Sequence, residues 1–101
     1  MGLLEGKRVF ISGTGGGQGR AAALVFAREG ARIFGCDLKG EGAEETVALV
    51  RQAGGFMESL HPLDLTAPGA ADEWISAGKR ALGGIDVLYN NAGSLRARGP
   101  F

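Results

Sequence analysis

Residues 7–19 read KRVFISGTGGGQG, a short apolar run that passes directly into a glycine-rich loop. The run at residues 9–11 favours a β-strand, Gly13 ends it, and the alanine-rich residues 20–29 favour a helix. The first amides of such a helix have no acceptor within it and carry the positive end of its dipole. A strand, a glycine turn and a helix in this order therefore predict a site for a phosphate group.

The glycine spacing supports this prediction but does not establish it alone. Gly13, Gly17 and Gly19 form the pattern G-x-x-x-G-x-G, and Gly17, Gly19 and Ala22 form G-x-G-x-x-A in a second frame. Bare glycines let the backbone approach a diphosphate closely. Glycine fills most of this loop, however, so a flexible linker between two packed elements stays open as an alternative.

The rest of the chain alternates strands and helices. Further strands are expected at residues 31–36, 56–60 and 85–89. A second helix is expected at 41–53, and a third from near Pro68 to Leu82 with Thr66 as its N-cap. The order βαβαβαβ predicts the α/β class, a Rossmann-type parallel sheet of four strands with helices on both faces.

Polar or glycine residues follow each predicted strand. They are Gly13, Asp37, Asp64 and residues 90–93, and the carboxyl ends of parallel strands meet at one edge of a sheet. Asp37 lies near the offset of about 20 residues expected for an acid that binds the adenosine ribose hydroxyls. Its carboxylate would repel a ribose 2′-phosphate, so NAD is favoured over NADP, although Arg20 and Lys39 keep NADP open.

These residues resemble the short-chain dehydrogenase/reductase family. The match is Ser12-Gly13-x-x-x-Gly17-x-Gly19 after the first strand, Asp37 after the second, Asp64-Leu65-Thr66 after the third, and residues 90–93 (Asn-Asn-Ala-Gly) after the fourth. The resemblance implies NAD(P)-dependent hydride transfer at an alcohol or carbonyl carbon. It also implies that Asp64 and the Leu65 backbone hold the adenine, that Asn90 ties neighbouring strands, and that Ala92 and Gly93 pass close to the cofactor ribose. The predicted cofactor-binding residues are Gly13, Gly17, Gln18, Gly19, Asp37, Leu38, Asp64, Leu65, Asn91, Ala92 and Gly93.

The catalytic residues of this family are not in the sequence. The family uses a tyrosine with a lysine four residues later, and the lysine lowers the tyrosine pKa for proton transfer. The only tyrosine here is Tyr89, with Gly93 four residues later, and it is predicted to lie in the core. Gln18 also stands where the family commonly has an apolar residue. We therefore expect residues 1–101 to be the cofactor-binding portion of a longer oxidoreductase that lacks the catalytic half, with a non-catalytic dinucleotide-binding or assembly module as the alternative.

Composition argues against several other classes of protein. Eleven basic residues balance eleven acidic ones, and no apolar stretch is long enough to span a membrane, so neither nucleic acid nor a membrane is expected as a partner. The single cysteine, Cys36, and a start without signal-peptide features suggest a cytoplasmic protein. His61 is expected in a loop without a catalytic or metal-binding partner. Because the sheet would keep an uncovered face and edge, a homo-oligomer is also expected.

Two further nucleotide-dependent classes fit the sequence less well. An S-adenosylmethionine methyltransferase shares the glycine loop and the acid after the second strand, but it does not explain residues 90–93. A P-loop NTPase is disfavoured because Gly19 is followed by Arg20 and Ala21 rather than by lysine and Ser/Thr.

Overall fold

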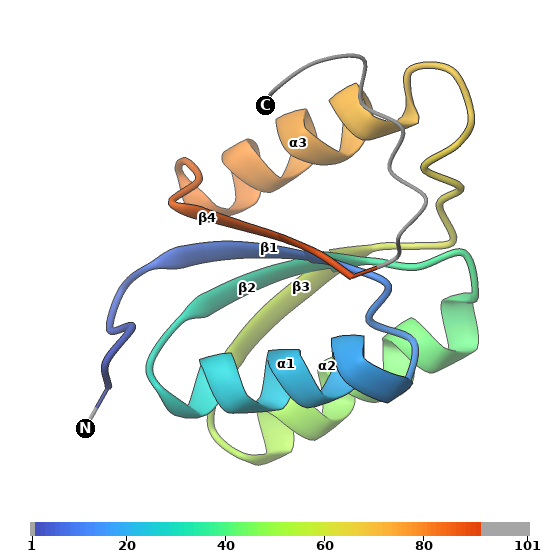
Figure 1. Cartoon of the computed structure of the whole chain (residues 1–101). Coiled ribbons are helices and arrows are strands. Elements are labelled where there is room, and N and C mark those ends of the chain that lie inside the picture. Colours follow the sequence, from blue (N-terminus) through green and yellow to red (C-terminus); the bar gives the residue numbers. More distant parts are fainter. Residues whose placement is uncertain (1, 92–101) are drawn as a thin grey trace.

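The computed structural model describes residues 2–91, and Met1 and residues 92–101 lie outside this description. Strands and helices alternate along the chain (Figure 1). Their bounds are β1 Arg8–Ser12, α1 Gly17–Arg28, β2 Arg32–Cys36, α2 Gly40–Gln52, β3 Phe56–Leu60, α3 Ala70–Leu82 and β4 Val87–Asn90. The predicted βαβαβαβ order is confirmed.

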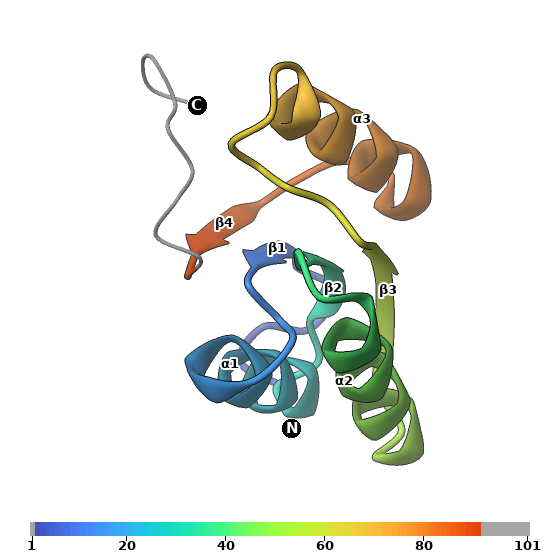
Figure 2. The ribbon, with the colours of Figure 1, turned by 90° about the vertical axis from the view of Figure 1, so that its right-hand side faces the viewer.

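The four strands form one parallel sheet in the order β3-β2-β1-β4. Helices α1 and α2 lie on one face and α3 lies on the other, which Figures 1 and 2 show from two sides. The register pairs Ser12 with both Cys36 and Asn90, so the carboxyl ends of β1, β2 and β4 are level. The turns that leave these ends meet at one edge of the sheet, as predicted.

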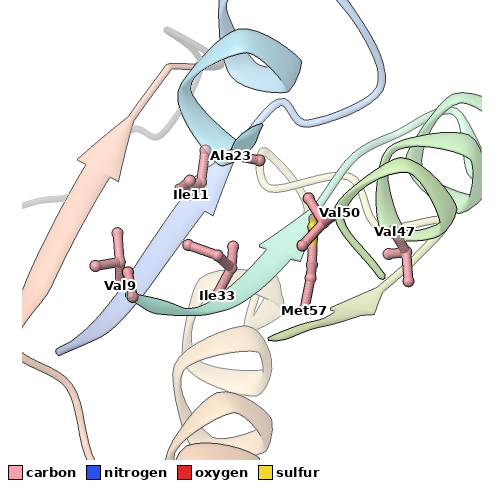
Figure 3. Packing of buried hydrophobic residues seen from close by; sticks show 8 residues of the cluster. Val9, Ile11, Ala23, Ile33, Val47, Val50 and Met57 are labelled. Carbon is pink, nitrogen blue, oxygen red and sulfur yellow. The ribbon is translucent and has the colours of Figure 1, made fainter. Parts of the chain in front are cut away.

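Each face of the sheet has its own apolar core. On the α1 and α2 face, strand side chains point toward the two helices (Figure 3). This core consists of Val9, Ile11, Ala23, Ala31, Ile33, Val47, Val50 and Met57. On the opposite face, Phe10 packs against the rings of Phe34 and Trp74, with ring centroids 5.6 and 5.5 Å apart. Burial on both faces explains why β1 and β2 read as continuous apolar runs rather than alternating ones.

The start of α3 differs from the prediction. The helix begins at Ala70 with Gly69 at the N-cap in a left-handed conformation (φ 78°), so Thr66 is not its cap. The Thr66 hydroxyl and amide instead both donate to Asp64 Oδ1, at 2.6 and 2.9 Å. A separate turn, closed by the Ala67 amide on the Asp64 carbonyl, therefore precedes the helix.

The prediction that Tyr89 belongs to the core is confirmed in part, because Tyr89 packs against the core on the α1 and α2 face but is not fully buried. It is half-buried, with its ring edge-on to Phe26 at a centroid distance of 5.6 Å. The reason is that β4 pairs with β1 on one side, while the described residues place no strand along its other edge.

An ion pair joins Arg8, the first residue of β1, to Asp86, which directly precedes β4, at the amino end of the sheet. Arg8 Nε lies 2.9 Å from Asp86 Oδ2, and the Arg8 amide donates to the same oxygen. The Arg8 side-chain hydrogen bond, followed by the amide bond, holds the pKa of Asp86 well below its usual range.

We expect this pair to contribute to acid sensitivity. Because the pKa of Asp86 is lower in the folded state, its contribution to stability is present above the unfolded-state pKa, about 4, and is lost as the pH falls toward the folded-state value. Asp86→Asn should therefore lose less stability between about pH 5 and pH 2 than the unchanged chain does, measured by urea unfolding at each pH. Glu58→Gln, which replaces an exposed carboxylate of β3, is the control. An unaltered pH profile in Asp86→Asn would contradict the role given to this pair.

Candidate functional site

The first half of the glycine loop is bonded to the end of β2. Gly13 has a φ of 75°, a left-handed conformation that suits glycine, and turns the chain out of β1. The amides of Gly13 and Thr14 both donate to the Cys36 carbonyl, at 2.9 and 3.2 Å. The Gly15 amide donates to Asp37 Oδ2 at 2.7 Å. These amides are therefore occupied by the protein itself.

The second half of the loop presents the amides that could hold an anion. Gly16 is the N-cap of α1 and has no capping side chain. Within residues 2–91, the amides at positions 16–19 donate no hydrogen bond to a protein acceptor. The start of α1 thus combines unpaired N–H groups with the positive end of the helix dipole, as a phosphate requires. The sequence pointed to the whole loop, and the structure narrows the donors to its second half.

Gly19 is required by close packing. A Cβ at this position would lie 1.8 Å from the Gly13 carbonyl oxygen and 2.9 Å from Asn91 Nδ2. Asn91 in turn donates from Nδ2 to that carbonyl at 3.1 Å. The start of α1 can therefore rest against the end of β1 only if residue 19 has no side chain. Gly17 is favoured for a different reason. Its backbone is left-handed (φ 54°), which suits glycine, whereas a Cβ there would meet nothing within 4 Å.

Asp37 fixes the turn after β2. Its Oδ2 accepts from the Gly15 amide, and its Oδ1 accepts from the Lys39 amide at 2.7 Å. A carboxylate offers about four lone-pair sites, so two such bonds leave capacity for two ligand hydroxyls. Asp37 can therefore support the glycine loop and still accept hydrogen bonds from a ribose.

A pocket of about 260 Å³ opens beside Asp37, between the ends of β2 and β3. It is lined by Gly13, Cys36, Asp37, Leu38, Leu63, Asp64 and Leu65. Leu38 is 63% exposed at its mouth, whereas Leu65 is buried against the core of the α3 face. Apolar walls with acids on two sides suit a flat heterocycle that carries polar edges.

Two titratable side chains that line this pocket, the exposed Asp64 and the buried Cys36, have shifted pKa values. The Thr66 hydroxyl, and then the Thr66 amide, lower the pKa of Asp64 by donating to its carboxylate. Asp64 is therefore ionised at neutral pH. Burial raises the pKa of the Cys36 thiol to about 12, so this cysteine is protonated and is not a nucleophile.

The residues after β4 reach the same edge. The Ser12 hydroxyl lies 2.9 Å from Asn90 Oδ1, so Asn90 joins β1 and β4 as predicted. Gln18 is exposed on the first turn of α1 and lines a shallow hollow beside Tyr89. The predicted contributions of Ala92 and Gly93 lie outside the described residues.

Two residues that support the loop were not predicted as site residues. Arg20 was noted only as a cation, and Thr46 was not singled out. Thr46 is fully buried, and its hydroxyl donates to the Thr14 carbonyl. The Arg20 side chain bonds both Thr46 and the Gly15 carbonyl, at 2.9 and 3.2 Å. No motif contains these contacts, because they depend on how α2 packs against the loop. The one local signal is Gly42, a glycine in the first turn of a helix.

Other site types find little support in residues 2–91. His61 lies in the loop after β3, with its ring nitrogens 2.7 Å from Ser59 Oγ and 3.1 Å from Glu44 Oε2. No group of three or more potential metal ligands occurs in this part of the chain. None of its helices has both the length and the apolarity that a membrane crossing needs.

Comparison with known proteins gives a consistent result. The sequence profile of the short chain dehydrogenase family matches residues 7–101. The chain is 44% identical over 93 residues to the uncharacterized oxidoreductase YxbG of Bacillus subtilis (strain 168), covering 92% of this chain and 34% of that protein. It is 38% identical over 93 residues to 2,3-dihydro-2,3-dihydroxybenzoate dehydrogenase of the same organism, covering 92% and 35%. The crystal structure of a short chain dehydrogenase from Mycobacterium smegmatis superposes with a TM-score of 0.84 at 32% identity, covering 90% of this chain and 38% of that one. The chain thus spans about a third of the length of these relatives.

Proposed function

Because the chain belongs to the short-chain dehydrogenase family, we propose that it is the cofactor-binding portion, residues 1–101, of an oxidoreductase that uses NAD. The observation that carries the proposal is the meeting of unpaired loop amides, Asp37 and the pocket beside Asp64 at one edge of the sheet. The amides suit the diphosphate, Asp37 suits the adenosine ribose, and the pocket suits the adenine, in the order in which these groups are joined in a dinucleotide.

The diphosphate would lie on the amides of residues 16–19, at the start of α1. The adenosine ribose would donate its hydroxyls to Asp37, whose carboxylate has acceptor sites left. The adenine would enter the pocket between Leu38 and Leu65, with its amino group toward Asp64. The second oxygen of Asp64 has no hydrogen-bond partner within residues 2–91, which suits this role.

Charge favours NAD over NADP. A 2′-phosphate would come close to the Asp37 carboxylate, which repels it. Arg20, one of the two cations that could compensate, has its Nε and Nη2 bonded to Thr46, Gly15, Gly42 and Glu45. Lys39 is the remaining cation, and it is exposed.

The proposed reaction is hydride transfer at the carbon of a small alcohol or carbonyl compound. When bound, the nicotinamide would donate or accept the hydride, and this chain would orient it by holding the other half of the cofactor. The proton would be transferred by residues beyond this sequence, since Tyr89 packs on Phe26 and has no lysine four positions later. The whole protein would act in the cytoplasm.

Titration of the chain with NADH and with NADPH, by calorimetry, tests the proposal. We expect NADH to bind more tightly than NADPH. Tighter binding of NADPH would overturn the choice of cofactor, and binding of neither would overturn the role of the site. Hydride transfer is tested in the full-length protein by following NADH absorbance with a panel of small alcohols and ketones. A full-length protein that binds NADH but turns over none of these compounds would favour the non-catalytic module.

We also propose a homo-oligomer. The outer edge of β4 is flanked by two apolar hollows on opposite faces of the sheet. One is lined by Ile75, Lys79, Ile85, Asp86 and Leu88, and the other by Gln18, Ala21, Ala22, Val25, Phe26 and Tyr89. Within residues 2–91 no strand pairs with this edge, and apolar surface beside an unpaired strand edge favours association. The thermal unfolding temperature should therefore rise with protein concentration, and a cooperative transition that is independent of concentration would contradict association.

A further inference from the structure

Two side chains, Arg20 of α1 and Thr46 of α2, hold the backbone of the glycine loop at Thr14 and Gly15. Thr46 Oγ1 donates to the Thr14 carbonyl and accepts a bond from Arg20 Nε at 2.9 Å. Arg20 Nη2 lies 3.2 Å from the Gly15 carbonyl and 3.1 Å from the Gly42 carbonyl. We call Arg20 and Thr46, with these contacts, the loop latch.

The packing beneath the latch leaves little room for movement. A Cβ on Gly42 would lie 2.3 Å from the Gly15 carbonyl oxygen, so the loop rests directly on the first turn of α2. Thr46 is fully buried at this contact. Glu45, largely exposed, completes the charge pairing of Arg20 at 3.0 Å.

Peptide planarity connects these contacts to the anion site. In a trans peptide the carbonyl of one residue and the amide of the next point in opposite directions in one plane. The plane between Thr14 and Gly15 is held at both ends, by Thr46 on the carbonyl and by Asp37 on the amide. The next plane has its carbonyl, that of Gly15, held by Arg20. Its other end is the Gly16 amide, the first of the unpaired donors, which is thereby directed away from α2.

We propose that Arg20 and Thr46 are positioning residues that orient the Gly16 amide toward the cofactor diphosphate. The inference rests on the proposed function and deepens it, because it assigns the orientation of the first phosphate donor to Arg20 of α1 and Thr46 of α2. Without the latch, the glycine-rich loop has the backbone freedom to turn this amide away, and binding must then supply the cost of ordering it.

The test compares variants of Thr46 that separate shape from hydrogen bonding. Thr46→Val keeps the volume and removes the hydroxyl, whereas Thr46→Ser keeps the hydroxyl. Thr46→Val loses one hydrogen bond that orients the loop, which is worth about 1 kcal/mol, so its affinity for NADH should fall about fivefold. Thr46→Ser keeps the hydroxyl and should retain most of the affinity. Adenosine, which has no diphosphate, should bind Thr46→Val as it binds the unchanged chain. NADH is titrated by calorimetry and adenosine by ligand-observed NMR.

Arg20→Gln is a second variant that tests the same proposal. It changes a side chain that is only partly buried, so it is informative even if Thr46→Val fails to fold. It should weaken NADH binding by a similar factor and leave adenosine binding unchanged. Arg28→Gln is the matched control, because it makes the same substitution in the last turn of α1, away from the loop. NADH affinity in this variant should equal that of the unchanged chain.

Two outcomes overturn the inference while leaving the proposed function in place. One is NADH binding to Thr46→Val and Arg20→Gln with unchanged affinity. The other is an equal loss of NADH and adenosine affinity, which would show that the latch only stabilises the fold. If the unchanged chain binds adenosine but not NADH, the proposed diphosphate site fails, and the positioning role fails with it.

Discussion

Gly19→Ala is expected to cause the largest loss of both stability and cofactor affinity among single changes at this site. The added Cβ would lie 1.8 Å from the Gly13 carbonyl oxygen, and this nearest neighbour is backbone, which cannot move aside as a flexible side chain could. Overpacking commonly costs 1 to 3 kcal/mol, so we expect about 3 kcal/mol lower free energy of unfolding. Urea unfolding measures this loss.

The same substitution should also disturb the diphosphate donors. Moving Gly13 away from α1 breaks its bond with Asn91 and shifts the loop amides that follow. Loss of two charge-assisted hydrogen bonds at about 1.5 kcal/mol each would weaken NADH binding roughly 150-fold. Calorimetric titration of the folded fraction measures the change.

Gly16→Ala is the matched control for stability, since it adds the same methyl group three residues earlier. Gly16 has an extended backbone (φ 164°), and nothing lies within 4 Å of a Cβ there. Its free energy of unfolding should stay within about 0.5 kcal/mol of the unchanged chain. If Gly19→Ala unfolds at the same urea concentration as Gly16→Ala, the close packing of α1 on β1 is not essential.

Asp37→Ala is expected to have the second largest effect, and to reverse the preference between cofactors. Removing hydrogen bonds from two ribose hydroxyls to a charged acceptor should weaken NADH binding by about 1 to 3 kcal/mol, or roughly 5- to 150-fold. NADPH should lose far less, because the repulsion of its 2′-phosphate disappears with the carboxylate.

The ratio of the two affinities is the decisive measurement. Asp37 also accepts the amides of Gly15 and Lys39, so its removal loosens the loop for either cofactor. The loss caused by the loosened loop is the same for both cofactors, so it cancels in the ratio of NADH to NADPH affinity. The effect of Asp37 on the ribose hydroxyls and the 2′-phosphate differs between the cofactors and remains in the ratio. Glu44→Gln removes an exposed carboxylate of α2 that faces His61, and should leave the ratio unchanged. Equal losses for both cofactors in Asp37→Ala would mean that Asp37 acts only on the loop.

The fold was predictable because its signals are local. Residues 9–11 and 33–36 are uncharged and buried, and glycines mark where the helices stop. Element boundaries were less predictable. The start of α3 was placed too early because the Asp64 and Thr66 side chains bond each other and form a turn of their own. Tyr89 was placed too deep because burial in β4 depends on what lies beside it.

The candidate site divides in the same way. The sequence identified Gly19 and Asp37 through their spacing, which reflects a turn and a helix of standard length. It did not reveal that Asp37 bonds the Gly15 amide, nor that Thr46 and Arg20 hold the loop. Apart from the bond from Arg20 to the Gly15 carbonyl, five positions away, those contacts join residues 22 to 32 positions apart, and short motifs carry no information at that range.

The sequence by itself determined the order of strands and helices, the parallel sheet and the family, because hydrophobic periodicity and glycine placement act over a few residues. Only the tertiary structure decided which loop amides stay unpaired. The carbonyl of Cys36 and the carboxylate of Asp37 come from a neighbouring strand and the turn after it, and they occupy the amides at positions 13–15. The physical reason is that a hydrogen-bond donor is available to a ligand only when no folded neighbour accepts from it, and neighbours are set by packing rather than by sequence order.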